Sequence, residues 1–140
     1  MNNYLPLICG IVGSEISDEE IQFIKKFNPW GIILFERNCK SKNQLIELTG
    51  TLRSILHENL PILIDQEGGR VSRINYSESV VFESARKFGE ILEKNMELGI
   101  RALSLHTMLI ACSLKEVGIN INTIPVLDIS SKNESGLIGN

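Results

Sequence analysis

Short apolar runs alternate with helical periodicities along the chain. The runs at 7–12, 31–35 and 61–64 contain no charged residue, which is typical of strands buried on both faces of a sheet. A fourth strand is expected within 119–127 and ends at Asp128. The first three runs are too short to form stable helices by themselves, so we interpret them as strands.

Between these runs, apolar residues recur at three- and four-residue spacing, which predicts helices. Ser17 or Asp18 is suited to cap a first helix that continues to Phe27, before an Asn-Pro pair ends it. Ser41 is expected to open a second helix over about 42–57. Each helix therefore lies between two predicted strands.

A long polar loop over about 66–82 precedes the last helical region, which covers about 83–117 and stops at Gly118. The apolar residues of this region follow a helical spacing, and one set of them is expected to face the core. We expect the buried stripe to consist of Leu98, Ala102, Leu105, Leu109 and Cys112.

The resulting order, β-α-β-α-β-α-β, favours a parallel sheet with helical crossovers in a single α/β domain. Two architectures fit this order. One is a small doubly wound sheet, for which 140 residues would be a complete protein. The other is part of a (β/α)₈ barrel, which normally needs about 250 residues. Periodicity does not choose between them.

Charge and composition exclude several classes of partner. With 14 basic against 17 acidic residues and 6% aromatic residues, nothing indicates nucleic acid or an anionic membrane surface. The first basic residue is Lys25, so the early apolar run lacks the positive flank of a secretory signal. We expect every apolar run to be too short to span a bilayer. We therefore expect a cytoplasmic protein without a membrane partner.

Polar clusters follow three of the predicted strands: Glu36-Arg37-Asn38, Asp65-Gln66-Glu67, and Asp128. In both architectures, ligands bind at the carboxyl ends of parallel strands. These clusters are therefore candidates for a binding site. The alternative is that they are merely solvated where the strands leave the core.

The segment from Asp65 to Arg73 carries the strongest chemical signal. Its paired glycines permit positive φ or close approach to a ligand. The flanking carboxylates and arginines can form charge-assisted hydrogen bonds to a polyhydroxy ligand. It lacks the G-x-x-x-x-G-K-[ST] pattern of a phosphate loop. The alternative without a ligand is a solvated turn with an Asp–Arg ion pair.

The sequence LIDQEGGRVSR at 63–73 resembles the signature of glycoside hydrolase family 3, specifically its bacterial β-N-acetylhexosaminidases. The segments at 31–38, 125–128 and 138–140 are similar to further motifs of that family, in the same order. The resemblance implies about four βα units, the N-terminal part of a (β/α)₈ barrel. It also implies a retaining glycosidase that releases terminal N-acetylglucosamine in peptidoglycan recycling, without a metal or other cofactor.

By the same resemblance, Asp65 corresponds to a carboxylate that binds sugar hydroxyls and Arg73 to a substrate-binding arginine. Other residues of these motifs are expected to shape the loop or to support the site from behind. These residues are Glu67, Arg70, Asp128 and Arg37.

The family's catalytic residues have no counterpart in these 140 residues. The resemblance places the nucleophilic Asp on a later strand and the general acid/base His in a K-H-F-P-G-H-G-like loop. His57 and His106 fall in predicted helices, which face away from the active mouth of such barrels. We therefore expect no catalytic pair and no activity from this chain alone.

Other hypotheses remain open at this point. The chain is either the N-terminal piece of a hexosaminidase or a non-catalytic sugar-binding or assembly module from a split or decayed gene. Open strand edges favour self-association or pairing with a second-half polypeptide. A complete doubly wound domain with an unrelated ligand is the third reading.

Overall fold

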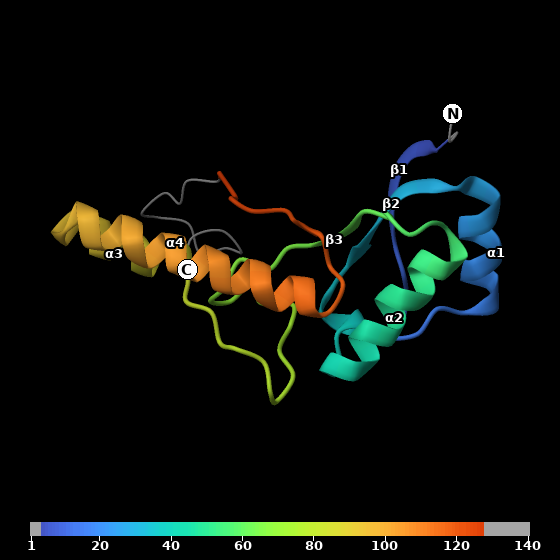
Figure 1. Cartoon of the computed structure of the whole chain (residues 1–140), viewed down its shortest axis with the longest axis horizontal. Helices are drawn as coiled ribbons and strands as arrows, with labels where there is room; N and C mark the ends of the chain where they lie inside the picture. Colours follow the sequence, from blue (N-terminus) through green and yellow to red (C-terminus); the bar gives the residue numbers. More distant parts are fainter. Residues whose placement is uncertain (1–3, 128–140) are drawn as a thin grey trace, which may run out of the picture.

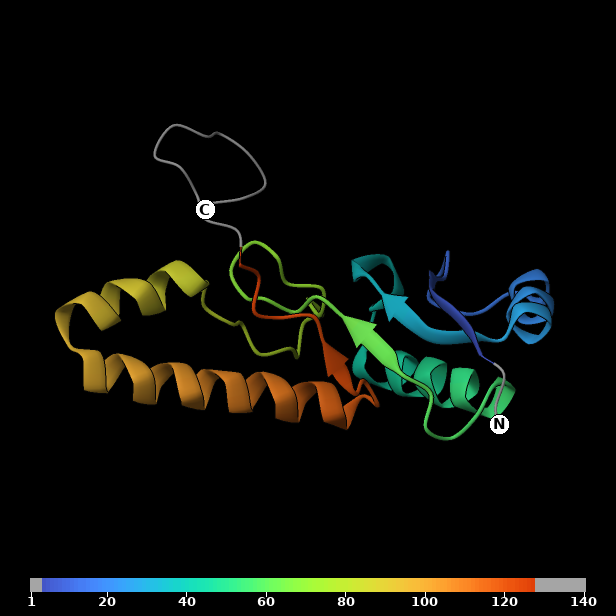
Figure 2. The same cartoon turned by 90° about the horizontal axis from the view of Figure 1, so that it is seen from above.

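The computed structural model describes residues 4–127, and its sheet is parallel throughout that range. The strands lie in chain order, as the two cartoons show (Figures 1 and 2). A doubly wound sheet reverses its order at a switch point, whereas a barrel adds each strand beside the previous one. The barrel portion is therefore confirmed and the doubly wound alternative is wrong. The strands are β1 (Leu5–Gly10), β2 (Pro29–Leu34), β3 (Ile62–Ile64) and β4 (Ile121–Asn122).

The described helices begin at the polar residues that the sequence indicated. Ser17 and Glu20 form a reciprocal capping box, with N···O distances of 3.2 and 3.0 Å. The Ser41 hydroxyl accepts a hydrogen bond from the next helix at 3.3 Å. The region expected at 83–117 is two helices, because Asn95 ends one and caps the other. The helices are α1 (Asp18–Phe27), η1 (Glu36–Asn38), α2 (Lys42–Ile55), α3 (Ala85–Lys94) and α4 (Met96–Glu116).

The hydrophobic core lies on the helix side of the sheet. Alternate residues of β2 and β3 are fully buried there, since neighbours in a strand point to opposite faces. Figure 2 shows α2 and α4 running along this same side of the strands. The core residues from strands and helices include Ile32, Leu34, Ile62, Ile64, Leu45, Leu52, Ile110 and Leu114.

The buried stripe expected on α4 is wrong. Leu98, Leu105 and Leu109 are each more than half exposed, and Cys112 is exposed. The cause is visible in Figure 2, where α3 and the first part of α4 form a hairpin that extends beyond the sheet. Ile110 and Leu114, in the last part of α4, are buried in the core, whereas Gly99 near its start is buried against Leu92 of α3.

Within residues 4–127, α4 is the helix that is long and apolar enough to cross a bilayer on length and composition alone. It has 21 residues, a mean hydropathy of 1.2 over its most apolar window, and 17% of that window is buried. The expectation that no apolar segment reaches this length is therefore wrong. Core helices of soluble proteins also meet this criterion, and the absence of a membrane partner stays a prediction.

The surroundings of His106 in α4 predict that stability is sensitive to acid. Its ring lies 5.5 Å from that of Phe82 and 4.5 Å from that of Phe88, between centroids. Burial lowers the pKa of His106, and the nearby Glu83 carboxylate opposes this effect. An unfolded His has a pKa of about 6.5, so on acidification the unfolded chain binds this proton first. The stability conferred by neutral His106 is present above that pH and is lost as the pH falls through the lower folded pKa.

We therefore expect the free energy of unfolding to decrease as the pH falls below about 6.5. The decrease should be smaller in His106→Leu, which removes the titrating group but keeps an apolar side chain beside the two phenylalanines. Urea unfolding of both proteins at several pH values measures the difference. An identical pH slope in wild type and variant would contradict this assignment.

Candidate functional site

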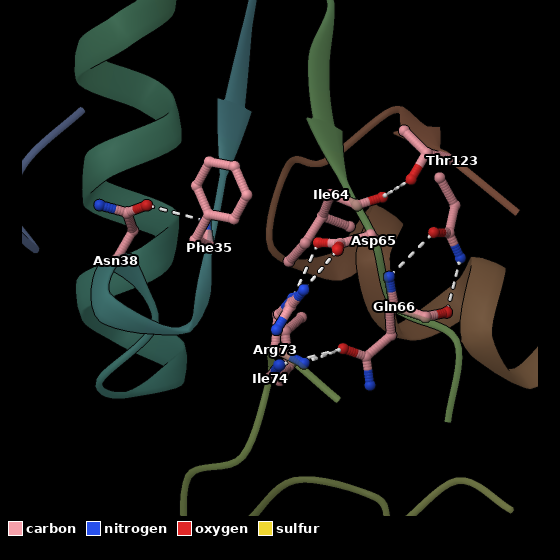
Figure 3. A network of polar contacts seen from close by, with 9 residues as sticks. Phe35, Asn38, Ile64, Asp65, Gln66, Arg73, Ile74 and Thr123 are labelled. Atoms are coloured by element: carbon pink, nitrogen blue, oxygen red, sulfur yellow. Dashed lines mark hydrogen bonds and ion pairs between the residues drawn. The ribbon is translucent and has the colours of Figure 1, made fainter. Parts of the chain in front are cut away.

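Asp65 and Arg73 form a two-pronged ion pair at the carboxyl edge of the sheet. Asp65 follows the last residue of β3, and the loop after it brings Arg73 back beside it (Figure 3). Arg73 Nε and Nη2 donate to the two Asp65 carboxylate oxygens at 2.8 and 2.5 Å. Donating hydrogen bonds to the Asp65 carboxylate raises the pKa of Arg73, against the opposing effect of burial. The Asp65 side chain is 23% exposed and the Arg73 side chain is 28% exposed, so solvent and ligand can reach both.

The buried amide of Gln66 holds the returning loop in place. Its side chain is completely buried, although the residue lies between two polar neighbours in the sequence. Gln66 Oε1 accepts hydrogen bonds from the backbone N–H groups of Arg73 and Ile74 at 2.7 and 3.0 Å. Its Nε2 donates to the Ser72 hydroxyl at 2.8 Å. Gln66 therefore positions the backbone from which Arg73 reaches Asp65.

Asn122, in β4, fixes Gln66 in turn. Its side-chain oxygen accepts from the Gln66 backbone N–H at 3.0 Å, and its Nδ2 donates to the Gln66 carbonyl at 3.0 Å. The backbone N–H of Thr123 donates to the Ile64 carbonyl at 2.9 Å. The Thr123 hydroxyl donates to the same carbonyl at 3.4 Å (Figure 3). Gln66 was predicted only as a member of the polar cluster after the third strand, and no pattern pointed to Asn122. Two features of the sequence could have indicated these roles. Gln66 is an amide close behind a buried strand, and Asn122 is an amide inside a predicted strand.

Both glycines of the loop have the positive φ that the sequence indicated, 94° at Gly68 and 59° at Gly69. The backbone N–H groups of Glu67 and Gly68 both donate to the Val71 carbonyl, at 3.0 and 3.2 Å, and close a tight turn. A Cβ on Gly68 would lie 2.2 Å from the Glu83 carbonyl oxygen. The glycines thus allow the turn to lie against the segment that leads into α3.

The end of β2 supports the site from the side. Asn38 is fully buried and its Nδ2 donates to the carbonyls of Ile11 and Gly13, at 3.2 and 2.6 Å. Arg37 Nε also donates to the Ile11 carbonyl, at 3.1 Å, and its guanidinium lies 4.6 Å from the Phe35 ring centroid. These contacts tie the ends of β1 and β2 together. A ligand contact by Arg37 is untested, and its supporting role stays a prediction.

The remaining candidates are spread around this pair. Glu36 and Glu67 are close enough that their charges raise the pKa of Arg73 further, after the larger effect of Asp65. Glu36 and Arg70 also line a cavity of about 160 Å³ inside the loop, together with Ser72. No ligand contact is tested for Glu67 or Arg70.

Four predicted features lie away from the pair or outside the described residues. His57 lies just before β3, at the opposite end of that strand from Asp65, and His106 packs between two phenylalanines. Within residues 4–127, the His57 ring contacts the ring of Tyr4 and not a residue of the loop that carries Arg73. Asp128 and the segment at 138–140 lie outside the described residues.

The ion pair leaves hydrogen-bonding capacity for a ligand. A carboxylate has about four lone-pair sites and a guanidinium has five N–H donors. The two Asp65–Arg73 hydrogen bonds use two of these lone-pair sites and two of these N–H donors. The remaining donors and acceptors lie side by side, which suits adjacent sugar hydroxyls, since each hydroxyl can both donate and accept.

Comparisons with known proteins agree with this geometry. The profile described as "Glycosyl hydrolase family 3 N terminal domain" matches residues 7–140. A beta-hexosaminidase from Xanthomonas oryzae pv. oryzae is 30% identical over 129 residues, which are 92% of this chain and 38% of the relative. The chain therefore spans less than half the length of that curated relative.

Solved structures give the same result. NagZ from Neisseria gonorrhoeae in complex with N-trifluoroacetyl-D-glucosamine superposes with a TM-score of 0.83 at 30% identity, over 90% of this chain and 37% of that chain. A glycoside hydrolase family 3 beta-N-acetylglucosaminidase from Paenibacillus has a TM-score of 0.76 at 31% identity, over 89% of this chain and 23% of its own length. With matching motifs, fold and profile, this chain belongs to glycosyl hydrolase family 3 and carries sequence of its N-terminal domain.

Proposed function

We propose that this chain supplies sugar-binding residues of a β-N-acetylhexosaminidase, an enzyme that hydrolyses terminal N-acetylglucosamine. The observation that carries the proposal is the partly exposed Asp65–Arg73 pair at the carboxyl edge of a barrel-type sheet. The family's glycosidase chemistry and the N-acylglucosamine derivative bound by one structural relative support the choice of sugar. Peptidoglycan recycling in the cytoplasm is the setting that we propose for this reaction.

We assign binding, and not bond cleavage, to the 140 residues by themselves. Retention requires a nucleophilic carboxylate and a general acid/base on opposite sides of the anomeric carbon. By the family resemblance these groups lie in motifs that residues 1–140 do not contain. The ion pair with Arg73 fixes the orientation of the Asp65 carboxylate. This carboxylate is therefore suited to accept hydrogen bonds from sugar hydroxyls.

Replacing Asp65 by alanine is expected to weaken N-acetylglucosamine binding by about tenfold to a hundredfold. Hydrogen bonds to a charged group contribute about 1.5 to 3 kcal/mol each, and the variant also releases Arg73 from its fixed orientation. Titration calorimetry with N-acetylglucosamine measures the change. Asp18→Ala is the matched control, because Asp18 is an exposed carboxylate in the first turn of α1.

Two results would overturn parts of the proposal. Equal heats in wild type and Asp65→Ala would remove Asp65 from the sugar site. Turnover of a chromogenic N-acetylglucosaminide by the pure 140-residue chain would show that the chain cleaves as well as binds. If the chain binds the sugar without turnover, and binding depends on Asp65, both parts are supported.

A further inference from the structure

A second cavity lies at the amino ends of the strands, opposite the carboxyl ends where Asp65 is located. It has a volume of about 450 Å³, within the range of small-molecule sites, which is about 300 to 1,000 Å³. Its walls come from segments at the amino ends of three neighbouring strands, β1, β2 and β3. The lining residues are Tyr4, Trp30, His57, Glu58, Asn59 and Pro61.

The cavity combines aromatic walls with a polar rim. Trp30 is 41% exposed, unusually open for so large an apolar side chain in a strand. The Tyr4 and His57 rings lie 5.0 Å apart between centroids and are tilted by 40°, so they form a second aromatic wall. Glu58 and Asn59 are exposed and add a carboxylate and an amide next to these rings.

Backbone hydrogen bonds of the sheet hold these walls in place. The Pro61 carbonyl accepts from the Ile32 N–H at 2.9 Å, which ties the start of β3 to β2. The Leu60 N–H donates to the His57 carbonyl at 3.1 Å and closes the turn that carries Glu58 and Asn59. A ligand therefore meets a preformed surface, and little has to be ordered when it binds.

The geometry points to a second binding site, for a neutral pyranose sugar. A pyranose has an apolar face of C–H groups that packs on aromatic rings such as Trp30, and hydroxyls at its edge. Glu58 can accept hydrogen bonds from those hydroxyls, while Asn59 can both donate and accept. The proposal is independent of the Asp65–Arg73 site, because the two sites lie at opposite ends of the strands.

Trp30 makes this proposal directly testable, because it is the one tryptophan in the sequence. A sugar that covers the indole removes it from water and shifts its fluorescence emission to shorter wavelength. We expect a saturable blue shift of wild-type emission during titration with N,N′-diacetylchitobiose. The same titration is run on Asp65→Ala, which alters only the other site, and on the double variant Glu58→Ala/Asn59→Ala.

The variants separate the two sites. The blue shift should persist in Asp65→Ala, and its midpoint should rise at least about fivefold in Glu58→Ala/Asn59→Ala, as loss of about 1 kcal/mol of hydrogen bonding requires. Both replaced rim residues are exposed, so the fold is retained, and thermal unfolding checks this. Equal calorimetric heats in wild type and Asp65→Ala, together with a blue shift that persists in both, would overturn the proposed function and leave this second site intact.

Three results would overturn the second site. One is no emission change at tens of millimolar sugar. Another is an emission change that disappears in Asp65→Ala, since the shift would then report the other site. The last is a shift with benzylamine and none with the sugar, which would assign the aromatic walls and Glu58 to a cationic ligand.

Discussion

Replacing Gln66 by leucine is expected to lower the free energy of unfolding by about 2 to 6 kcal/mol and to reduce sugar binding with it. Leucine is similar in size but cannot accept the hydrogen bonds from the backbone N–H groups of Arg73 and Ile74. Each buried donor left without a partner costs about 1 to 3 kcal/mol. The loop then relaxes toward water, and Arg73 loses the position from which it contacts Asp65.

Urea unfolding and calorimetric titration with N-acetylglucosamine measure the two effects. Thr49→Val is the control: Thr49 is also buried, and its hydroxyl bonds to the carbonyl of Val117 under α2. The Thr49→Val variant should be less stable than wild type, but its folded form should bind the sugar with unchanged affinity. Gln66→Glu should recover part of both properties, since its carboxylate can still accept both backbone hydrogen bonds. If Gln66→Leu bound the sugar like wild type, Gln66 would be a structural residue without a positioning role.

Short-range patterns predicted the local structure of this chain well. Ser17 and Glu20 are three residues apart, so the capping box that they form depends on neighbours in the sequence alone. The strand runs at 31–35 and 61–64 are also local signals, and both overlap the observed strands. Strand order is different, because periodicity does not say which strand lies beside which. The family resemblance supplied that information before the structure showed it.

Long-range contacts account for what the sequence did not predict. Asn122 meets Gln66 across 56 residues of chain, and no spacing rule connects two amides that far apart. On α4, apolar residues occur around most of the helix, so periodicity could not identify the face that meets the core. The observed face follows from the hairpin with α3, where Gly99 packs so closely that a Cβ would lie 2.6 Å from a Leu92 methyl carbon.

Substituting Gly68 by alanine is expected to destabilise the chain by about 2 to 5 kcal/mol. The φ of 94° lies in the left-handed half of conformational space, where a Cβ costs about 1 to 2 kcal/mol. The added Cβ would also lie 2.2 Å from the Glu83 carbonyl oxygen, a backbone atom that cannot move without displacing the start of α3. Overpacking of this kind adds about 1 to 3 kcal/mol. Sugar affinity should fall as well, because the turn carries the chain toward Arg73.

Gly50→Ala is the matched control, because the same methyl group there has the opposite effect. Gly50 lies inside α2 with open space where its Cβ would be, so alanine should stabilise the helix by about 0.5 to 1 kcal/mol. Urea unfolding of both variants therefore gives shifts of opposite sign if the loop requires glycine for its geometry. A Gly68→Ala protein as stable as wild type would mean that the turn adopts another path, and the contact between Asp65 and Arg73 would then need a different support.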